Sequence, residues 1–328
     1  MVQFGGLLIA IFTTPTLQFY VQSGSTEINS FEAALFYLVY IVAVAGLILL
    51  VLRYFRKPKM FTLMEGLVVL LATGFVLFAI FNTIFTNINS TYLLIAAAAI
   101  TIALIIAKNI FPKLRNFIAI TSSIGVGILI GFNGFYLAYF LMMLIAVYDY
   151  IAVFVTKHMI AMAQEMSSRN LAFLIGSTDV EAVPKKYMSK VDISEFKKQE
   201  RKNKDPFVKN LVKKGIFPVV SQVQLGTGDL ALPLMLSVSA YISFLSYFSA
   251  VMIALGSAAG MIFTMYLLKR YKVALPAIPP LFAFINLFLS LLFAINNVQN
   301  YRLWLGFLIV FVVTVLALLN KLNGIKRG

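Results

Sequence analysis

Long apolar runs separated by short polar segments dominate the chain. The runs are roughly 20 residues long, which is the length an α-helix needs to cross a hydrocarbon core about 30 Å thick. The pattern predicts an all-α, polytopic helical membrane protein with nine to ten transmembrane helices, organised as a single transmembrane domain over residues 1–328. The expected helices cover residues 2–22, 31–52, 61–85, 91–107, 116–132, 135–156, 226–244, 248–268, 274–295 and 302–320. Pro15 leaves open whether the first of them spans the membrane.

One hydrophilic segment interrupts this pattern. Residues 157–215 hold 13 Lys/Arg and 7 Asp/Glu, so the loop between the sixth and seventh helices is net positive. Its first part, residues 158–175, keeps apolar positions and is compatible with a helix on the membrane surface. Residues 185–214 are rich in charged residues and are not expected to form a packed structure.

The basic residues alternate along the chain. They follow the second, fourth, sixth, eighth and tenth helices, whereas the intervening loops hold almost none. By the positive-inside rule, the N- and C-termini and loop 157–215 face the cytoplasm.

Composition agrees with this class. The chain is 61% hydrophobic with a mean hydropathy of +0.93, outside the range of soluble globular proteins. The net charge of +15 is gathered in the loops, so membrane orientation explains it better than nucleic-acid binding. There is no cysteine, and the one histidine is His158, which excludes a thiolate site, a His-Glu-x-x-His zinc site and a serine site with a membrane-buried His base. No metal or cofactor is expected.

Two carboxylates lie within apolar runs, Asp149 and Asp229. An ionisable group at the centre of a transmembrane helix costs about 2.5–3.5 kcal/mol on insertion scales, so its presence indicates function. Asp149 precedes Lys157 by eight residues, about 12 Å of α-helix, and Asp229 begins a span that is entered from the same side. If the two meet, they share a proton and can activate water, as in an aspartic protease. From the spacing alone, a proton- or ion-coupled transporter or a leak channel that uses the two aspartates is about as good an interpretation as a protease.

Glycines favour the hydrolytic reading. Gly226 and Gly228 flank Thr227 directly before Asp229, where they permit close approach of another backbone. Together with Tyr148-Asp149 and Pro276-Ala277-Ile278, this segment resembles the presenilin and signal peptide peptidase family of Gly-x-Gly-Asp intramembrane aspartyl proteases, and a microbial, archaeal-type presenilin homologue in particular.

The resemblance implies a presenilin-like bundle that cleaves transmembrane helices or signal peptides within the lipid bilayer, without a cofactor and without partner subunits. It implies that Asp149 and Asp229 are catalytic. The peptide would be positioned by Tyr148, Gly226, Thr227, Gly228, Pro276, Ala277 and Ile278.

Three features depart from the family pattern. Ile278 replaces the leucine of a Pro-Ala-Leu motif, and the tenth helix has no place among nine. Loop 157–215 is shorter than presenilin's and lacks its hydrophobic self-cleavage segment, whereas Pro233 resembles the signal peptide peptidase branch. The substrate, the cleavage register and the oligomeric state are left open.

The alternatives make different demands on the sequence. A transporter often shows internal repeats, and none is visible here. A prepilin-peptidase-like Gly-x-Gly-Asp protease would carry its first aspartate in a loop, whereas apolar runs flank Asp149. Two further patterns give structural expectations. Residues 219–223 have strand character and could hold an unwound peptide by β-augmentation, and Gly256 with Gly260 indicates close helix packing.

Overall fold

The structure, a computed structural model, describes residues 2–22, 58–108, 112–156, 174–184, 216–271, 275–296 and 301–327. Within the second expected helix, residues 31–52, it describes only Glu32, Leu35, Phe36, Val39 and Ala43, all helical. The expectations for the rest of that helix, for residues 158–173 and for residues 185–214 lie outside the described residues.

The described residues form nine helices and two strands. The predicted all-α class is confirmed, with one short strand pair added to it. The helices are α1 (Val2–Gln22), α3 (Pro58–Ile84), α4 (Ser90–Ala107), α5 (Pro112–Gly131), α6 (Phe135–Phe154), α10 (Thr227–Phe244), α11 (Tyr247–Tyr271), α12 (Ile278–Asn296) and α13 (Tyr301–Arg327).

Eight of these helices are long and apolar enough to cross a membrane. They are α3, α4, α5, α6, α10, α11, α12 and α13. The apolar described part of α1, Val2–Thr14, is shorter than a span. The large apolar side chains left exposed on these helices, such as Leu71, Ile95 and Ile262, are those expected to face lipid.

Local chemistry sets several helix boundaries. The side chain of Asn89 accepts a hydrogen bond from the backbone N–H of Thr91 (3.0 Å) and so caps α4. Gly134 has a φ of 95°, which allows the tight turn between α5 and α6. Pro279 and Pro280 lie in the first turn of α12, where a missing N–H leaves no helical bond unmade.

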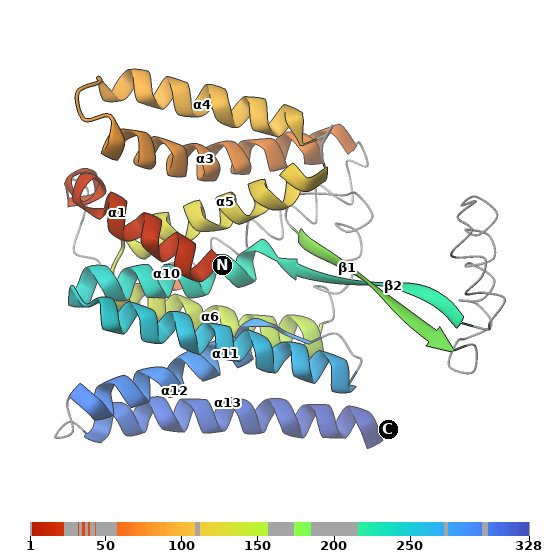
Figure 1. Cartoon of the computed structure of the whole chain (residues 1–328). Helices are drawn as coiled ribbons and strands as arrows, with labels where there is room; N and C mark the ends of the chain where they lie inside the picture. The colour runs from red at the N-terminus through yellow and green to blue at the C-terminus, as the bar shows by residue number, and fades with distance from the viewer. Residues whose placement is uncertain are drawn as a thin grey trace. The chain divides into compact units, whose positions relative to one another are not determined.

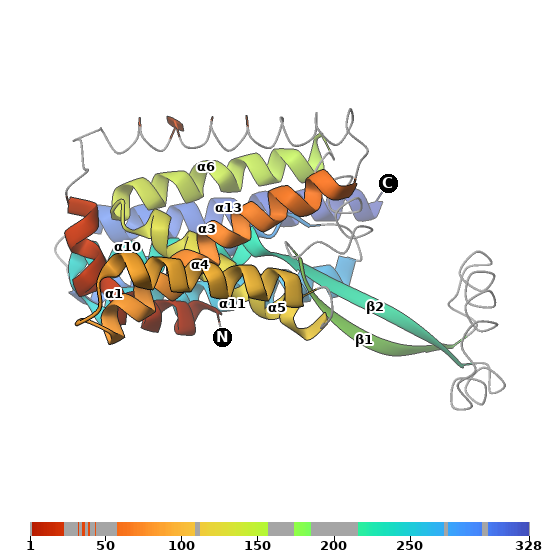
Figure 2. The ribbon, with the colours of Figure 1, turned by 90° about the horizontal axis from the view of Figure 1, so that it is seen from above.

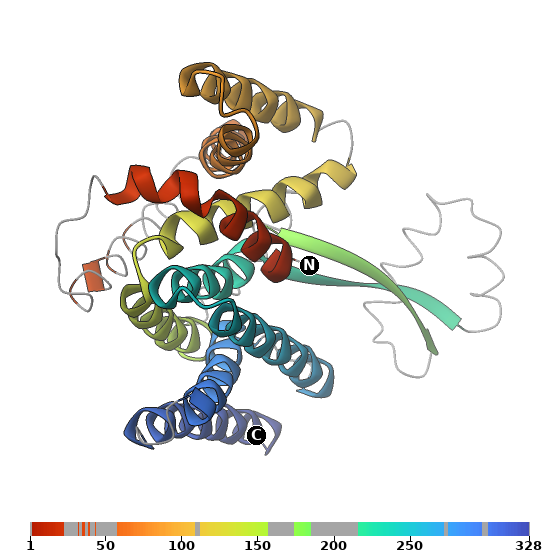
Figure 3. The ribbon, with the colours of Figure 1, turned by 60° about the vertical axis from the view of Figure 1, so that its left-hand side comes forward.

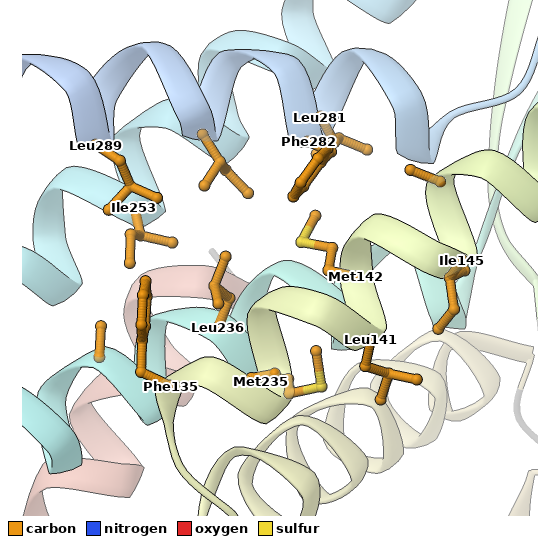
Figure 4. Close-up of a cluster of buried hydrophobic side chains, with 14 of the residues drawn as sticks. Phe135, Leu141, Met142, Ile145, Met235, Leu236, Ile253, Leu281, Phe282 and Leu289 are labelled. Carbon is orange, nitrogen blue, oxygen red and sulfur yellow. The ribbon is translucent and has the colours of Figure 1, made fainter. Parts of the chain in front are cut away.

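The chain divides into two compact units, Met1–Leu174 with Gly226–Gly328, and Ile175–Leu225. In the helical unit, α10 contacts α1, α5, α6, α11 and α12, and Figure 3 shows it surrounded by them. α12 packs against both α11 and α13, as Figure 1 shows. Figure 4 shows the buried cluster formed by α6, α10, α11 and α12, with Leu141, Met235 and Leu281 among its members.

Glycines bring the helices into close contact. A Cβ on Gly260 of α11 would lie 2.7 Å from the Cα of Leu281, and one on Gly256 would lie 3.0 Å from the Cα of Ile285. This confirms that the Gly256/Gly260 pair serves helix packing, here between α11 and α12. Gly127 of α5 approaches α10 in the same way, since its Cβ would be 2.9 Å from the carbonyl oxygen of Ala231.

The strands β1 (Leu174–Pro184) and β2 (Ile216–Gly226) form a two-stranded sheet. Figure 1 shows the two running in opposite directions, and Figure 2 shows the pair from above. β2 contains residues 219–223, whose strand character is confirmed. The strand β1 was not predicted, and it replaces the end of the surface helix expected over residues 158–175.

Candidate active site

The helices α6 and α10 place the two aspartates at one depth. The backbone N–H of Phe135, at the start of α6, donates to the Oγ of Ser243, near the end of α10 (3.0 Å). The ring of Phe135 also contacts that of Phe244, with centroids 4.9 Å apart. Asp149 lies fourteen residues after Phe135, and Asp229 lies fourteen residues before Ser243. Each carboxylate is therefore about 21 Å of α-helix from the shared bond, which brings them level where the helices run antiparallel.

Asp149 is held from α12. It is only 4% exposed, and its Oδ2 accepts a hydrogen bond from the backbone N–H of Ile278 (3.1 Å). The backbone of Ala277 is a second hydrogen-bonding partner of the same carboxylate. A buried carboxylate is costly unless its oxygens are satisfied, and backbone N–H groups supply that here.

The donors are available because the chain is unwound before α12. Leu275, Pro276 and Ala277 lie outside any helix, and α12 begins at Ile278. Pro276 restricts Leu275 to extended conformations, so a helix cannot continue through this segment. Pro276 is buried. The first N–H groups of a helix have no partner within it, and the N–H of Ile278 is therefore free to bind Asp149.

Asp229 has a different setting, in the first turn of α10. It is half-buried, and its electrostatic partners include Asp149, so the two carboxylates are close enough to interact. The Gly226 backbone is a hydrogen-bonding partner of its carboxylate. A Cβ on Gly226 would lie 3.2 Å from Oδ2 of Asp229, whereas one on Gly228 would meet nothing within 4 Å. Gly228 is exposed, and Thr227 is half-buried.

The structure thus brings together Asp149, Asp229, Gly226, Ala277 and Ile278. Tyr148 is part of the same site because it is next to Asp149 in α6. It is half-buried and interacts electrostatically with Asp149. Among the described residues, neither Thr227 nor Gly228 forms a hydrogen bond with Asp149 or with α12.

Two buried amides near these helices were missed from the sequence. The Nε2 of Gln3, in α1, donates to the carbonyl oxygen of Leu230 (3.0 Å), one residue after Asp229. Asn286 of α12 accepts from the hydroxyl of Tyr139 in α6 (2.7 Å). The only signal for either was a lone amide in an apolar run.

A helical membrane bundle that brings two carboxylates together at one depth has the makeup of an intramembrane aspartyl protease. Residues 2–295 match the family described as "Signal-peptide peptidase, presenilin aspartyl protease", and the chain belongs to this family. α13 lies beyond the matched residues. No curated protein sequence matches the chain.

Solved structures agree in fold. A structure of a presenilin family intramembrane aspartate protease in space group C222 has 18% identity and a TM-score of 0.53, covering 88% of this chain and 93% of that chain. A second structure of such a protease, in space group P2, has 20% identity and a TM-score of 0.53, covering 90% and 96%.

The family match decides between the alternatives. The chain is a multi-pass integral membrane protein and an intramembrane aspartyl protease, a hydrolase of peptide bonds that acts on transmembrane substrates. The transporter and the prepilin-peptidase-like enzyme are not supported.

Proposed function

We propose that Asp149 and Asp229 are the catalytic pair of this protease. The observation that carries the assignment is their convergence from α6 and α10, with Asp149 fixed by the N–H of Ile278. Two carboxylates that interact at short range do not both ionise readily, so the pair holds one proton between them.

That protonation state fits peptide hydrolysis. The ionised carboxylate takes a proton from a water molecule, whose oxygen attacks the scissile carbonyl carbon. The protonated carboxylic acid gives its proton to the carbonyl oxygen, and a tetrahedral diol forms. When the C–N bond breaks, the carboxylic acid of the pair protonates the leaving nitrogen, and the other carboxylate takes the proton of one diol hydroxyl. The products are a carboxylic acid and an amine, and the pair again holds one proton. The rate should fall at both low and high pH, because the reaction requires one charged and one neutral carboxyl group.

The peptide would approach on the glycine side. The exposed, side-chain-free Gly228 offers open backbone beside Asp229, and Gly226, Thr227 and Tyr148 border the same carboxylates. On the other side of the two carboxylates, the segment Pro276-Ala277-Ile278 would limit the space open to the peptide. The substrates are transmembrane or signal-peptide helices cut near their cytoplasmic ends, and no partner subunit takes part.

The assignment is tested with the purified chain and a helical transmembrane peptide, with the products sized by mass spectrometry. Wild type should cleave the peptide without any added protein. Asp149→Asn and Asp229→Asn should each abolish cleavage with unchanged helix content. Glu32→Gln is the matched control, because Glu32 is an exposed carboxylate. Cleavage that survives either aspartate change would overturn the assignment.

The orientation rests on the basic loops and has its own test. Reporters fused to the C-terminus and inserted in loop 157–215 should both read out in the cytoplasm. Opposite readouts would reject the proposed topology.

A further inference from the structure

The first turn of α10 is weakly tied by its own backbone. Within a helix, the carbonyl of Asp229 would accept from the N–H of residue 233, but that residue is Pro233, which has no N–H. Gly228 adds no side-chain contact, since a Cβ there would meet nothing within 4 Å. The turn that carries Asp229 therefore lacks a helical hydrogen bond at the catalytic residue itself.

A residue of α1 makes a tertiary bond at this point. Gln3 is only 8% exposed, and its Nε2 donates to the carbonyl oxygen of Leu230 at 3.0 Å. α1 lies close to α10 here, because a Cβ on Gly6 would overlap the side chain of Leu234. The bond thus joins two closely packed helices whose partners are 227 residues apart in sequence.

Packing alone does not account for an amide at this position. The Oε1 of Gln3 is buried and accepts no hydrogen bond from the described residues. A half-satisfied buried amide costs free energy that an apolar side chain of similar shape, such as methionine, would not cost. The compensating effect therefore has to come from the hydrogen bond that Nε2 donates to the carbonyl oxygen of Leu230.

We infer that Gln3 is a positioning residue for the protease reaction, which fixes the first turn of α10 so that Asp229 faces Asp149. The bond holds the carbonyl of Leu230, whose peptide unit follows Asp229 by one residue. Fixing that carbonyl restricts rotation of the turn, which Pro233 would otherwise leave loose. The inference rests on the proposed catalytic role of Asp229.

The test compares Gln3→Met with Thr14→Val in the purified full chain. Thr14 is the matched control, since it is a buried polar residue of the same helix. Among the described residues its hydroxyl bonds only within α1, to the carbonyl of Ala10 (2.6 Å). Gln3→Met should lower kcat roughly 10- to 100-fold, because small misplacements of catalytic groups cost that much. KM and the thermal midpoint should stay close to wild type, and Thr14→Val should keep the wild-type kcat.

Two readouts separate positioning from general destabilisation. Hydrogen exchange of the peptide that contains residues 227–231 should be faster in Gln3→Met and unchanged in Thr14→Val. Gln3→Glu keeps the shape of the side chain; its acid form can donate to Leu230 and its ionised form cannot. Its rate relative to wild type should therefore fall as pH rises.

The outcomes are distinct from those for Asp229. A wild-type kcat and wild-type exchange in Gln3→Met would overturn the inference, even if Asp229→Asn is inactive. An equal loss of kcat in Thr14→Val would also overturn it, since the loss would then report the stability of α1. If Asp229→Asn stays active while hydrogen exchange in Gln3→Met becomes faster, the catalytic role of Asp229 is wrong. The Gln3–Leu230 bond then has a structural role only, and Gln3 is not a positioning residue.

Discussion

Asp149 and Asp229 are held by their surroundings in opposite ways. Asp149 lies well inside α6, is 4% exposed and accepts an N–H from α12. Asp229 lies in the first turn of α10, half-buried, between glycines on one side and a proline on the other. Asp149 is thus fixed by contact with a segment distant in sequence, whereas Asp229 belongs to a helical turn whose backbone has few restraints of its own.

This difference indicates that the two sides of the carboxylate pair have different roles in substrate binding. The Asp149 side is the more closed one, because Asp149 is buried and hydrogen-bonded to the start of α12. The Asp229 side has exposed backbone and small residues, which a peptide needs for close approach. A substrate would thus be brought to the fixed carboxylate through the open one.

Lengthening each carboxylate should separate the two sites most strongly. Asp149→Glu and Asp229→Glu should each lower kcat at least about 100-fold, because the reacting oxygens are displaced. Only Asp149→Glu should also lower the free energy of unfolding, by about 1–3 kcal/mol, since its extra methylene is forced into a packed site. Thermal unfolding in detergent checks this. Equal destabilisation by both variants would mean that Asp149 is packed no more tightly than Asp229.

Removing the N–H of Ile278 should come next in effect. Ile278→Pro deletes this donor, and proline is tolerated at the first position of a helix. We expect kcat to fall roughly 10- to 100-fold as Asp149 loses its restraint.

The control for this change is Ile278→Val, which keeps the N–H and costs about 0.5–1.5 kcal/mol in stability. Peptide cleavage measured on both gives the comparison. If Ile278→Pro and Ile278→Val are equally active, the backbone bond does not position Asp149.

The two glycines should affect different kinetic constants. Gly226 has extended backbone (φ −67°, ψ 141°), so alanine fits there, but its Cβ would stand 3.2 Å from Oδ2 of Asp229. Gly226→Ala should lower kcat about 10-fold through the displaced carboxylate. Gly228→Ala meets no atom of the chain and should raise KM with little change in kcat, since only a bound peptide would feel it. Steady-state kinetics on both variants tests this, and a KM effect confined to Gly226→Ala would reverse the roles.

The same contrast explains what the sequence could predict. The spans follow from hydropathy, and an acid in an apolar run, such as Asp149, stands out by its cost. The Gly-x-Gly-Asp segment marks Asp229 by local composition. These signals are contained in short windows of sequence.

Tertiary partners could not be predicted in this way. The N–H of Ile278 meets Asp149 only because α12 packs on α6, and Gln3 meets Leu230 across most of the chain. β1 alternates only over residues 179–182, because residues 176–179 are glycine or polar and apolar residues are adjacent at 174–175 and 182–183. Such contacts depend on which helices become neighbours, which periodicity does not contain.

The smallest effect on activity is expected at the far end of the fixed side. The hydroxyl of Tyr139 donates to Oδ1 of Asn286, which is fully buried and whose Nδ2 donates to the carbonyl of Phe282 (2.8 Å). This bond joins the same helices, α6 and α12, as the Asp149–Ile278 bond. Tyr139 lies ten residues before Asp149, about 15 Å along α6.

Tyr139→Phe should lower the free energy of unfolding by about 1–3 kcal/mol, because it leaves a buried acceptor unsatisfied. Adding Asn286→Leu should restore most of that loss, since no unpaired polar atom then remains. The exposed Tyr136 gives the control Tyr136→Phe, which should be neutral. Thermal unfolding and peptide cleavage are measured on all of them. Because the Ile278 bond is intact, the folded Tyr139→Phe variant should keep its kcat within about threefold of wild type. A large loss of kcat in the folded Tyr139→Phe variant would mean that Asp149 is positioned by the whole α6–α12 contact, including the bond of Tyr139 to Asn286.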